Sequence, residues 1–189
     1  MSKLFIAAGF APMVLAAAVL APQSALAAST VFGGGMAEAC SKAAIRGEVD
    51  AQYEKVCTES LKTEFLDTQD RAGTYVNRGV LRLRRASYDD ATRDFDEAAR
   101  LAPNLGEAYV NRGAALVGRR QFSQALVDIN RAIDLGVDEP AKAYYNRALA
   151  YEGLDNLKAA YFDYQKAQEI SPEWEAPKKE LARFSVSKP

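Results

Sequence analysis

The chain of 189 residues is almost neutral, with 24 lysines and arginines against 25 acidic residues and a formal net charge of −1. That balance gives no electrostatic reason to expect a nucleic acid or an anionic membrane surface as a partner. The chain has no histidine and two cysteines, which excludes a His-bearing catalytic triad and a zinc centre of the usual ligands. Phosphate-binding and dinucleotide-binding glycine patterns are also missing. We therefore expect no metal, no cofactor and no enzymatic activity.

Residues 1–27 have the pattern of a secretory signal peptide. Lys3 supplies a positive charge, residues 4–20 are uncharged and apolar, and residues 25–27 have the small-x-small pattern of a cleavage site. The alternative is an uncleaved membrane anchor, and Pro12 within the apolar stretch favours cleavage. We expect a periplasmic or secreted protein with no membrane insertion after the signal is cleaved.

Two segments follow the signal before the most regular part of the chain. Residues 28–35 include three consecutive glycines and are predicted to form a flexible leader. Residues 36–67 have helical spacing of apolar residues on both sides of Gly47, which predicts a pair of helices. Their pattern is weak, so we expect this pair to act as an N-terminal cap.

The rest of the chain is dominated by a repeat with three copies, residues 72–105, 106–140 and 141–174, of which the first two begin 34 residues apart. Pro140 is one extra residue before the third copy. Counted within each copy, the recurring residues are Tyr75, Tyr109 and Tyr144 at position four; Asn77, Asn111 and Asn146 at six; Arg78, Arg112 and Arg147 at seven; Gly79, Gly113 and Ala148 at eight; Ala91, Ala125 and Ala160 at twenty; Asp94, Asp128 and Asp163 at twenty-three; Phe95, Ile129 and Tyr164 at twenty-four; and Ala98, Ala132 and Ala167 at twenty-seven.

This pattern resembles the tetratricopeptide repeat, a helix–turn–helix unit of the same period. Small residues at eight, twenty and twenty-seven let neighbouring helices approach closely, and the bulky residue at twenty-four fills the space between them. One unit cannot bury its apolar face alone, so the units must stack as a solenoid. We predict an all-α fold with an N-terminal helical pair, three repeats, and a capping helix and frayed tail in residues 175–189.

The resemblance also suggests how the two cysteines pair. If Ser60 is placed at position twenty-seven of a divergent unit, Cys40 falls at position seven and Cys57 at twenty-four, which face each other across the two helices. An exported chain with two cysteines so placed favours an intramolecular disulfide. The alternatives are an intermolecular bridge or a catalytic thiol, and the second lacks a histidine base.

The arginine at seven and the aspartate at twenty-three recur together and have two interpretations. They form either a row of charge that binds a ligand or a structural ion pair between neighbouring helices. Recurrence in step with the core favours the structural pair, because each unit then satisfies its own charge.

In the tetratricopeptide family the first helix of each unit lines a concave groove. An asparagine side chain both donates and accepts, so three at position six can bond the backbone of an extended peptide without reading its sequence. The alternative is that these asparagines bond helix backbones. The candidate peptide-binding residues are Val76, Asn77, Val80, Val110, Asn111, Ala114, Tyr145, Asn146 and Leu149.

The groove differs from the carboxylate clamp with which some members of this family hold a chaperone C-terminus. Lys142 and Asn111 are compatible with a clamp, but Val76 and Val80 stand where a lysine and an asparagine are needed. We expect a scaffold that binds an aliphatic peptide or a partner helix in the groove. The alternative is an assembly subunit of an envelope complex, and self-association is compatible with either.

Overall fold

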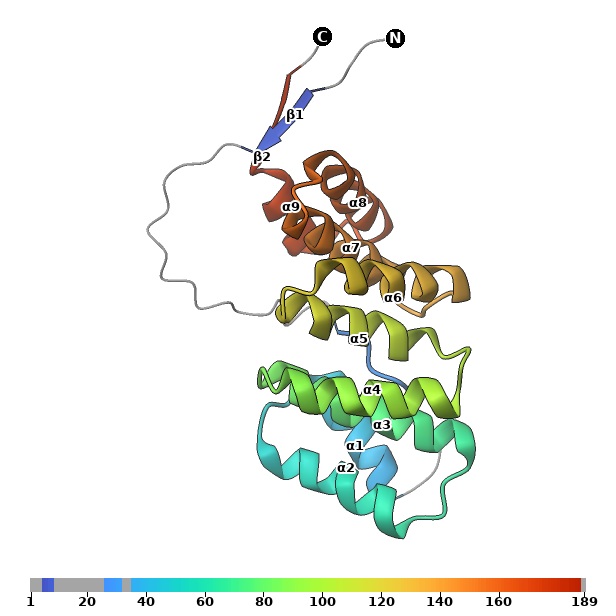
Figure 1. Cartoon of the computed structure of the whole chain (residues 1–189). Helices are drawn as coiled ribbons and strands as arrows, with labels where there is room; N and C mark the ends of the chain where they lie inside the picture. Colours follow the sequence, from blue (N-terminus) through green and yellow to red (C-terminus); the bar gives the residue numbers. More distant parts are fainter. Residues whose placement is uncertain (1–4, 9–25, 32–34, 188–189) are drawn as a thin grey trace.

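The computed structural model describes residues 5–8, 26–31 and 35–187 of the chain. Most of this part is helical, with consecutive antiparallel helix pairs followed by one short helix (Figure 1). In chain order the helices are α1 (Met36–Arg46), α2 (Ala51–Thr63), α3 (Thr68–Arg84), α4 (Tyr88–Leu101), α5 (Gly106–Gly118), α6 (Phe122–Leu135), α7 (Pro140–Gly153), α8 (Leu157–Ile170) and α9 (Glu175–Leu181).

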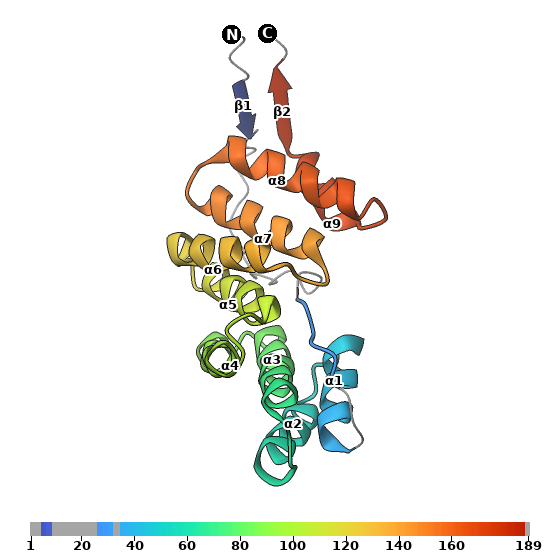
Figure 2. The same cartoon turned by 90° about the vertical axis from the view of Figure 1, so that its right-hand side faces the viewer.

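The helix pairs α1–α2, α3–α4, α5–α6 and α7–α8 stack one on another, and each pair contacts its neighbours in the stack (Figure 2). The helix α9 covers the last pair, where it packs on α8. The predicted all-α solenoid is therefore confirmed. Its first helices in the three repeats, α3, α5 and α7, follow one another along the same side of the stack, so position six of each repeat lies on a common face.

A small residue opposite a bulky one holds each repeat together. A Cβ atom added at Gly79 would lie 2.4 Å from Cε1 of Phe95, and one added at Gly113 would lie 2.5 Å from Cγ1 of Ile129. Both bulky side chains are fully buried. Because protein interiors are close-packed, no larger residue fits at Gly79 or Gly113 without displacing its partner.

The turn between the two helices of each repeat contains one residue in the left-handed conformation. The φ angles are 58° at Ala86, 60° at Arg120 and 59° at Asp155, and these residues occupy the same position in their repeats. The next N–H, for example that of Ser87, donates to the carbonyl of Arg82 at 2.9 Å, which closes the helix end. None of the three is glycine, so the sequence pattern did not reveal this turn.

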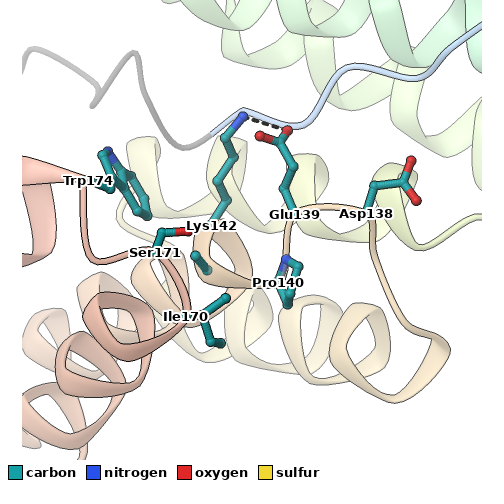
Figure 3. Close-up of a pocket in the computed structure, with 8 residues that line it drawn as sticks. Asp138, Glu139, Pro140, Lys142, Ile170, Ser171 and Trp174 are labelled. Atoms are coloured by element: carbon teal, nitrogen blue, oxygen red, sulfur yellow. Dashed lines mark hydrogen bonds and ion pairs between the residues drawn. The ribbon is translucent and has the colours of Figure 1, made fainter.

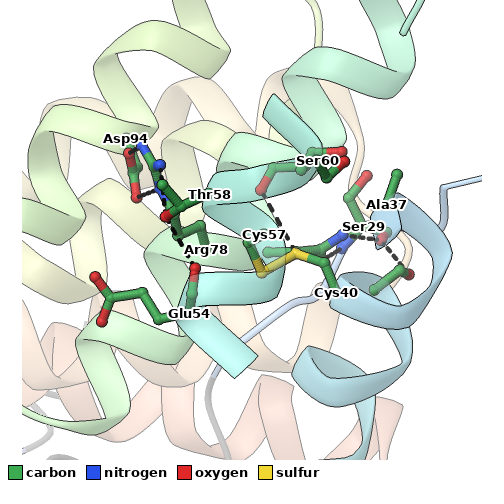
Figure 4. Close-up of a disulfide and its surroundings, with 12 residues drawn as sticks. Ser29, Ala37, Cys40, Glu54, Cys57, Thr58, Ser60, Arg78 and Asp94 are labelled. Atoms are coloured by element: carbon green, nitrogen blue, oxygen red, sulfur yellow. Dashed lines mark hydrogen bonds and ion pairs between the residues drawn. A yellow bond between two sulfur atoms is a disulfide. The ribbon is translucent and has the colours of Figure 1, made fainter. Parts of the chain in front are cut away.

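The N-terminal pair is closed by a covalent bond in place of that packing. Cys40 of α1 and Cys57 of α2 form a disulfide, both residues are fully buried, and their Cα atoms are 5.0 Å apart (Figure 4). The predicted intramolecular bridge is confirmed, and neither cysteine is free.

The start of α1 is capped by a residue that follows α2. The carboxylate of Glu64 accepts the N–H of Met36 at 2.7 Å and that of Ala37 at 2.8 Å. Ser60 donates its hydroxyl to the same carboxylate at 2.6 Å. The hydrogen bond from Ser60, with those from the two backbone N–H groups, lowers the pKa of Glu64 although burial opposes the change.

The C-terminal residues form a strand, where the sequence predicted a frayed tail. β2 (Phe184–Ser187) pairs in antiparallel register with β1 (Phe5–Ala8), and Phe5 lies opposite Ser187. Phe184 is 9% exposed and lies 5.7 Å from Tyr161 and 6.0 Å from Tyr164, measured between ring centroids. That aromatic contact anchors the strand to α8, and the two strands lie side by side next to α8 (Figure 2).

β1 lies within the predicted signal peptide, but most of the apolar stretch of that peptide is outside the described residues, so the signal remains a prediction. In the part of the chain that the structure describes, no helix has the length and apolar character needed to cross a membrane.

Candidate peptide-binding groove

The predicted groove residues lie on the first helices of the three repeats, α3, α5 and α7. The three asparagines at position six are buried, with exposed fractions of 0% for Asn77 and Asn111 and 1% for Asn146. Val76, Val80 and Val110 are buried as well. Ala114 and Leu149 are half-buried. A polar side chain with no exposure needs a hydrogen-bond partner, and that partner identifies the role of the asparagines.

Residues 26–31, which we call the strap, lie in this groove. They pass along the first helices of the repeats towards α1 (Figure 2). Ala27 is 1% exposed, Ser29 9% and Val31 4%, whereas Thr30 is exposed. The composition of residues 28–35 predicted a flexible leader, and this prediction is wrong for residues 28–31, because burial and hydrogen bonds hold them. Residues 32–34 of that leader lie outside the described part.

Asn111 and Asn77 bind alternate residues of the strap through the main chain. Asn111 accepts the N–H of Ala27 at 3.1 Å and donates to the carbonyl of the same residue at 2.6 Å. Asn77 accepts the N–H of Ser29 at 3.0 Å and donates to its carbonyl at 2.8 Å. Each amide thus satisfies both polar groups of one peptide residue, and successive repeats hold every second residue. In an extended chain, every second side chain points to the same side.

Two further side chains bind carbonyl groups of the strap. Lys142 of α7 donates its Nζ to the carbonyl of Leu26 at 2.7 Å and to Oε2 of Glu139 at 2.6 Å. Ser41 of α1 donates its hydroxyl to the carbonyl of Ser29 at 2.9 Å. The strap therefore contacts the N-terminal pair and the third repeat as well as the two asparagine-bearing helices between them.

One glycine allows the strap to approach α3. A Cβ added at Gly73 would lie 3.0 Å from Cγ2 of Val31 and 3.1 Å from Oγ of Ser29. Gly73 occupies position two of its repeat, where the next two repeats have Glu107 and Lys142. The candidate residues did not include Gly73 or Ser41. A glycine inside a helical pattern was the signal that could have identified the close approach at Gly73.

Tyr145 is placed differently from the other candidates. Its ring lies 4.9 Å from that of Trp174 and 5.4 Å from that of Tyr164, and it is 3% exposed. Burial, with the nearby carboxylates of Glu180 and Glu152, raises the pKa of its hydroxyl. Tyr145 therefore belongs to the aromatic core between the third repeat and α9.

The recurring arginine and aspartate form structural ion pairs. In each repeat the guanidinium binds both carboxylate oxygens of the aspartate, at 2.7 to 3.0 Å, and lies over the tyrosine ring at position four at 5.1 to 5.4 Å. The remaining nitrogen reaches the preceding helix pair. Its acceptors are Thr58 for Arg78, Asp96 for Arg112 and Asn130 for Arg147. These pairs join successive units and leave no row of free charge, as the sequence interpretation favoured.

The hydrogen bonds that the guanidinium groups donate to the aspartates raise the pKa of two of these arginines. Above all, the bond to Asp128 raises the pKa of Arg112, and the bond to Asp163 does the same for Arg147, although burial acts in the opposite direction in both cases.

A pocket of about 470 Å³ opens beside the end of the groove (Figure 3). It lies between the start of α7 and the loop after α8, and its walls include Pro140, Ile170 and Trp174. Lys142 is the cation on this wall, and its amine is already bound to Glu139 and to the strap. Within residues 5–8, 26–31 and 35–187, no cluster of three acidic or cysteine residues has the arrangement of a metal site.

The repeats are similar to those of known tetratricopeptide-repeat proteins. The family model described as "Tetratricopeptide repeat" matches residues 141–173. The chain is 35% identical over 91 residues to a DnaJ homolog subfamily C member 7 homolog of Dictyostelium discoideum, a match that covers 46% of this chain and 17% of that protein. The chain thus spans about a sixth of that relative. These similarities support the family assignment of the repeats.

Solved structures agree with the fold. The tetratricopeptide-repeat domain of Arabidopsis OM64 matches with a TM-score of 0.58 and 25% identity, covering 62% of this chain and 96% of that one. The first such domain of Spaghetti (RPAP3), bound to the HSP90 peptide SRMEEVD, matches with a TM-score of 0.57 and 26% identity, covering 62% and 92%. The second of these structures holds a peptide.

Proposed function

We propose that this chain is a non-enzymatic scaffold that binds an extended peptide in the concave groove of its repeats. The observation that carries the proposal is the pairing of Asn77 and Asn111 with the backbone of Ser29 and Ala27. A groove that forms these bonds to an internal segment has the geometry to form them to another chain. The peptide-bound structure among the similar domains supports the same use of the fold.

The chemistry of the groove favours a peptide held by its main chain. The asparagine amides are neutral and contact backbone groups, so they require no particular side chain and no terminal carboxylate. Valines at positions five and nine supply apolar walls, at Val76, Val80 and Val110. The acidic peptide of the similar structure is therefore a poor model for the partner of this chain, and an aliphatic or small-residue peptide fits better.

We place this activity in the periplasm or outside the cell. The support is the pattern of residues 1–27 together with the buried Cys40–Cys57 disulfide, since disulfides persist in oxidising compartments. N-terminal sequencing of the protein recovered from the envelope or medium of its host tests the proposal. We expect a first residue close to Ala28, and an intact Met1 in the cytoplasm would contradict it.

The function is tested by affinity capture from the host envelope with matched baits. One bait carries Asn77→Asp and Asn111→Asp, which keep the side-chain size and remove the donor to the peptide carbonyl. The control bait carries Asn104→Asp on an exposed loop. A partner recovered by the wild type and the control but lost with the double variant supports a peptide-binding groove. Equal recovery by all three baits contradicts it and favours assembly through another face.

A further inference from the structure

We propose that the strap is an internal competitor of the groove, and that a partner peptide enters by displacing it. The inference rests on the proposed function and adds both a form of regulation and the class of peptide. It starts from the observation that the strap already uses the two-way bonds of Asn77 and Asn111. Any peptide that needs those amides must therefore break the bonds to Ser29 or Ala27.

Tethering makes the strap a strong competitor. Residues 26–31 are separated from α1 by only a few residues, and a segment on a short linker has an effective concentration in the millimolar range. A free peptide with the same contacts must compete against that local concentration. The groove of the intact chain consequently binds a free peptide more weakly than its contacts alone would allow.

The contacts of the strap side chains indicate which peptides fit. Ala27, Ser29 and Val31 are buried, and the strap passes so close to α3 that a Cβ added at Gly73 would lie 3.0 Å from Val31 and 3.1 Å from Ser29. The residues between them line a side pocket of about 440 Å³ with Arg84 and Lys142; of these residues Leu26 is also buried, Ala28 is half-buried and Thr30 is exposed. The partner is therefore an extended peptide with small residues at alternate positions and freer choice between them.

Maturation would relieve only part of this competition. Cleavage after Ala27 would remove Leu26 and Ala27, the residues bound by Lys142 and Asn111. Ser29 would remain on Asn77 and Ser41. In the mature protein the strap then closes the part of the groove at the first repeat, and the partner enters from the second and third.

The competition is tested with Ser29→Pro, which removes the N–H that Asn77 accepts and leaves the residue present in the mature chain. The matched control is Thr30→Pro, at an exposed position whose N–H has no hydrogen bond to the described residues. The probe is a fluorescein-labelled, end-capped peptide of sequence Leu-Ala-Ala-Ser-Thr-Val, and its binding is followed by fluorescence polarisation. We expect Ser29→Pro to bind the probe at least fivefold more tightly than the wild type or Thr30→Pro. Equal affinity of the three proteins overturns the competition.

Two more arms separate this inference from the proposed function. The double variant with Ser29→Pro and Asn77→Asp should no longer bind the probe. If it still binds, the groove itself is not the binding site and the proposed function fails. A probe with tryptophan in place of serine should bind at least tenfold more weakly, while tryptophan in place of threonine should leave the affinity unchanged. An equal loss of affinity for both probes would overturn the requirement for small residues at alternate positions of the peptide.

A last arm needs no ligand and remains informative if Ser29→Pro is poorly folded. Hydrogen exchange of the wild-type chain reports directly on the amide of Ser29. We expect protection comparable to that of the surrounding helices. Exchange at the rate of an unstructured peptide overturns the strap as an occupant of the groove.

Discussion

The N-terminal pair and the three repeats join their two helices by different bonds. Each repeat joins position seven of its first helix to position twenty-three of its second by an arginine–aspartate ion pair. In the N-terminal pair a disulfide joins Cys40, predicted at position seven, to Cys57, predicted at twenty-four, next to the position that the aspartate occupies in the repeats. A unit with a weak repeat pattern therefore relies on a covalent bond where the regular repeats rely on packing and charge.

We therefore expect the two kinds of unit to unfold under different conditions. A disulfide responds to reductant, whereas an ion pair between helices responds to loss of either charge. Solenoid units contact only their neighbours, so damage at one end should remain partly local. The four predictions below test this difference in order of decreasing effect.

Removal of the disulfide should have the largest effect. Replacement of Cys40 and Cys57 by serine should lower the free energy of unfolding by about 3 kcal/mol, the value expected for a loop of this size. Hydrogen exchange should increase most in α1 and α2 and least in α7 and α8. Reductant should destabilise the wild type and have no effect on the variant. Uniform exchange along the whole chain would show that the units do not differ.

Overpacking within a repeat should be the next largest effect. Ala125 is fully buried between the helices of the second repeat, so Ala125→Leu should cost ~1–3 kcal/mol. Gln124→Leu adds the same side chain at an exposed neighbouring position and should change stability little. Urea unfolding of both variants measures the difference, and an unchanged midpoint for Ala125→Leu would contradict the close approach of α5 and α6.

Loss of one ion-pair partner should cost somewhat less. Asp163 has a side chain only 10% exposed, and Asp163→Asn leaves Arg147 without its charged partner, at a cost of about 1–3 kcal/mol. Lys166→Met removes an exposed pair with Glu169 on the same helix and should stay within about 0.5 kcal/mol. Thermal melts under reducing and oxidising conditions should show the same loss, since this unit has no disulfide.

Acid should affect the N-terminal pair through Glu64. Its pKa is lowered in the folded chain from an ordinary value of 4.5, so its stabilising effect is complete above that value and is lost as the pH falls through the folded pKa. Exchange at the start of α1 should therefore increase as the pH falls below 4.5. Glu64→Gln should reduce that dependence, and an identical pH profile for both proteins would exclude Glu64 as the cause.

Most of the fold could be predicted because the residues that pack the helices together recur at the same positions in three copies of the repeat. Position eight facing position twenty-four, the arginine–aspartate pairs and the pairing of the two cysteines all follow from residues in register. The left-handed turns at Ala86, Arg120 and Asp155 could not be predicted, since backbone geometry there is shared while residue type is not.

The groove was predicted in part, for a physical reason. Asn77 and Asn111 were named as residues able to bind a peptide backbone, but their partner was expected from outside the chain. Three glycines and a signal-like stretch predict a mobile segment, and local composition carries no information on a distant groove that can bury it. The contact of Tyr145 with Trp174 could not be predicted, because the pattern of one helix does not show which side the capping helix covers.

The strap also acts on the mechanics of the solenoid. An extended chain advances about 3.3 Å per residue and cannot stretch further without breaking its bonds to the amides. Asn111 and Asn77 hold residues two apart, so the strap sets an upper limit on the distance between α5 and α3 on the concave side. Lys142 and Ser41 extend this limit towards α7 and α1. In the uncleaved chain the strap is thus an inextensible tie between the first helices of the repeats, and cleavage after Ala27 would release that tie from Asn111 and Lys142.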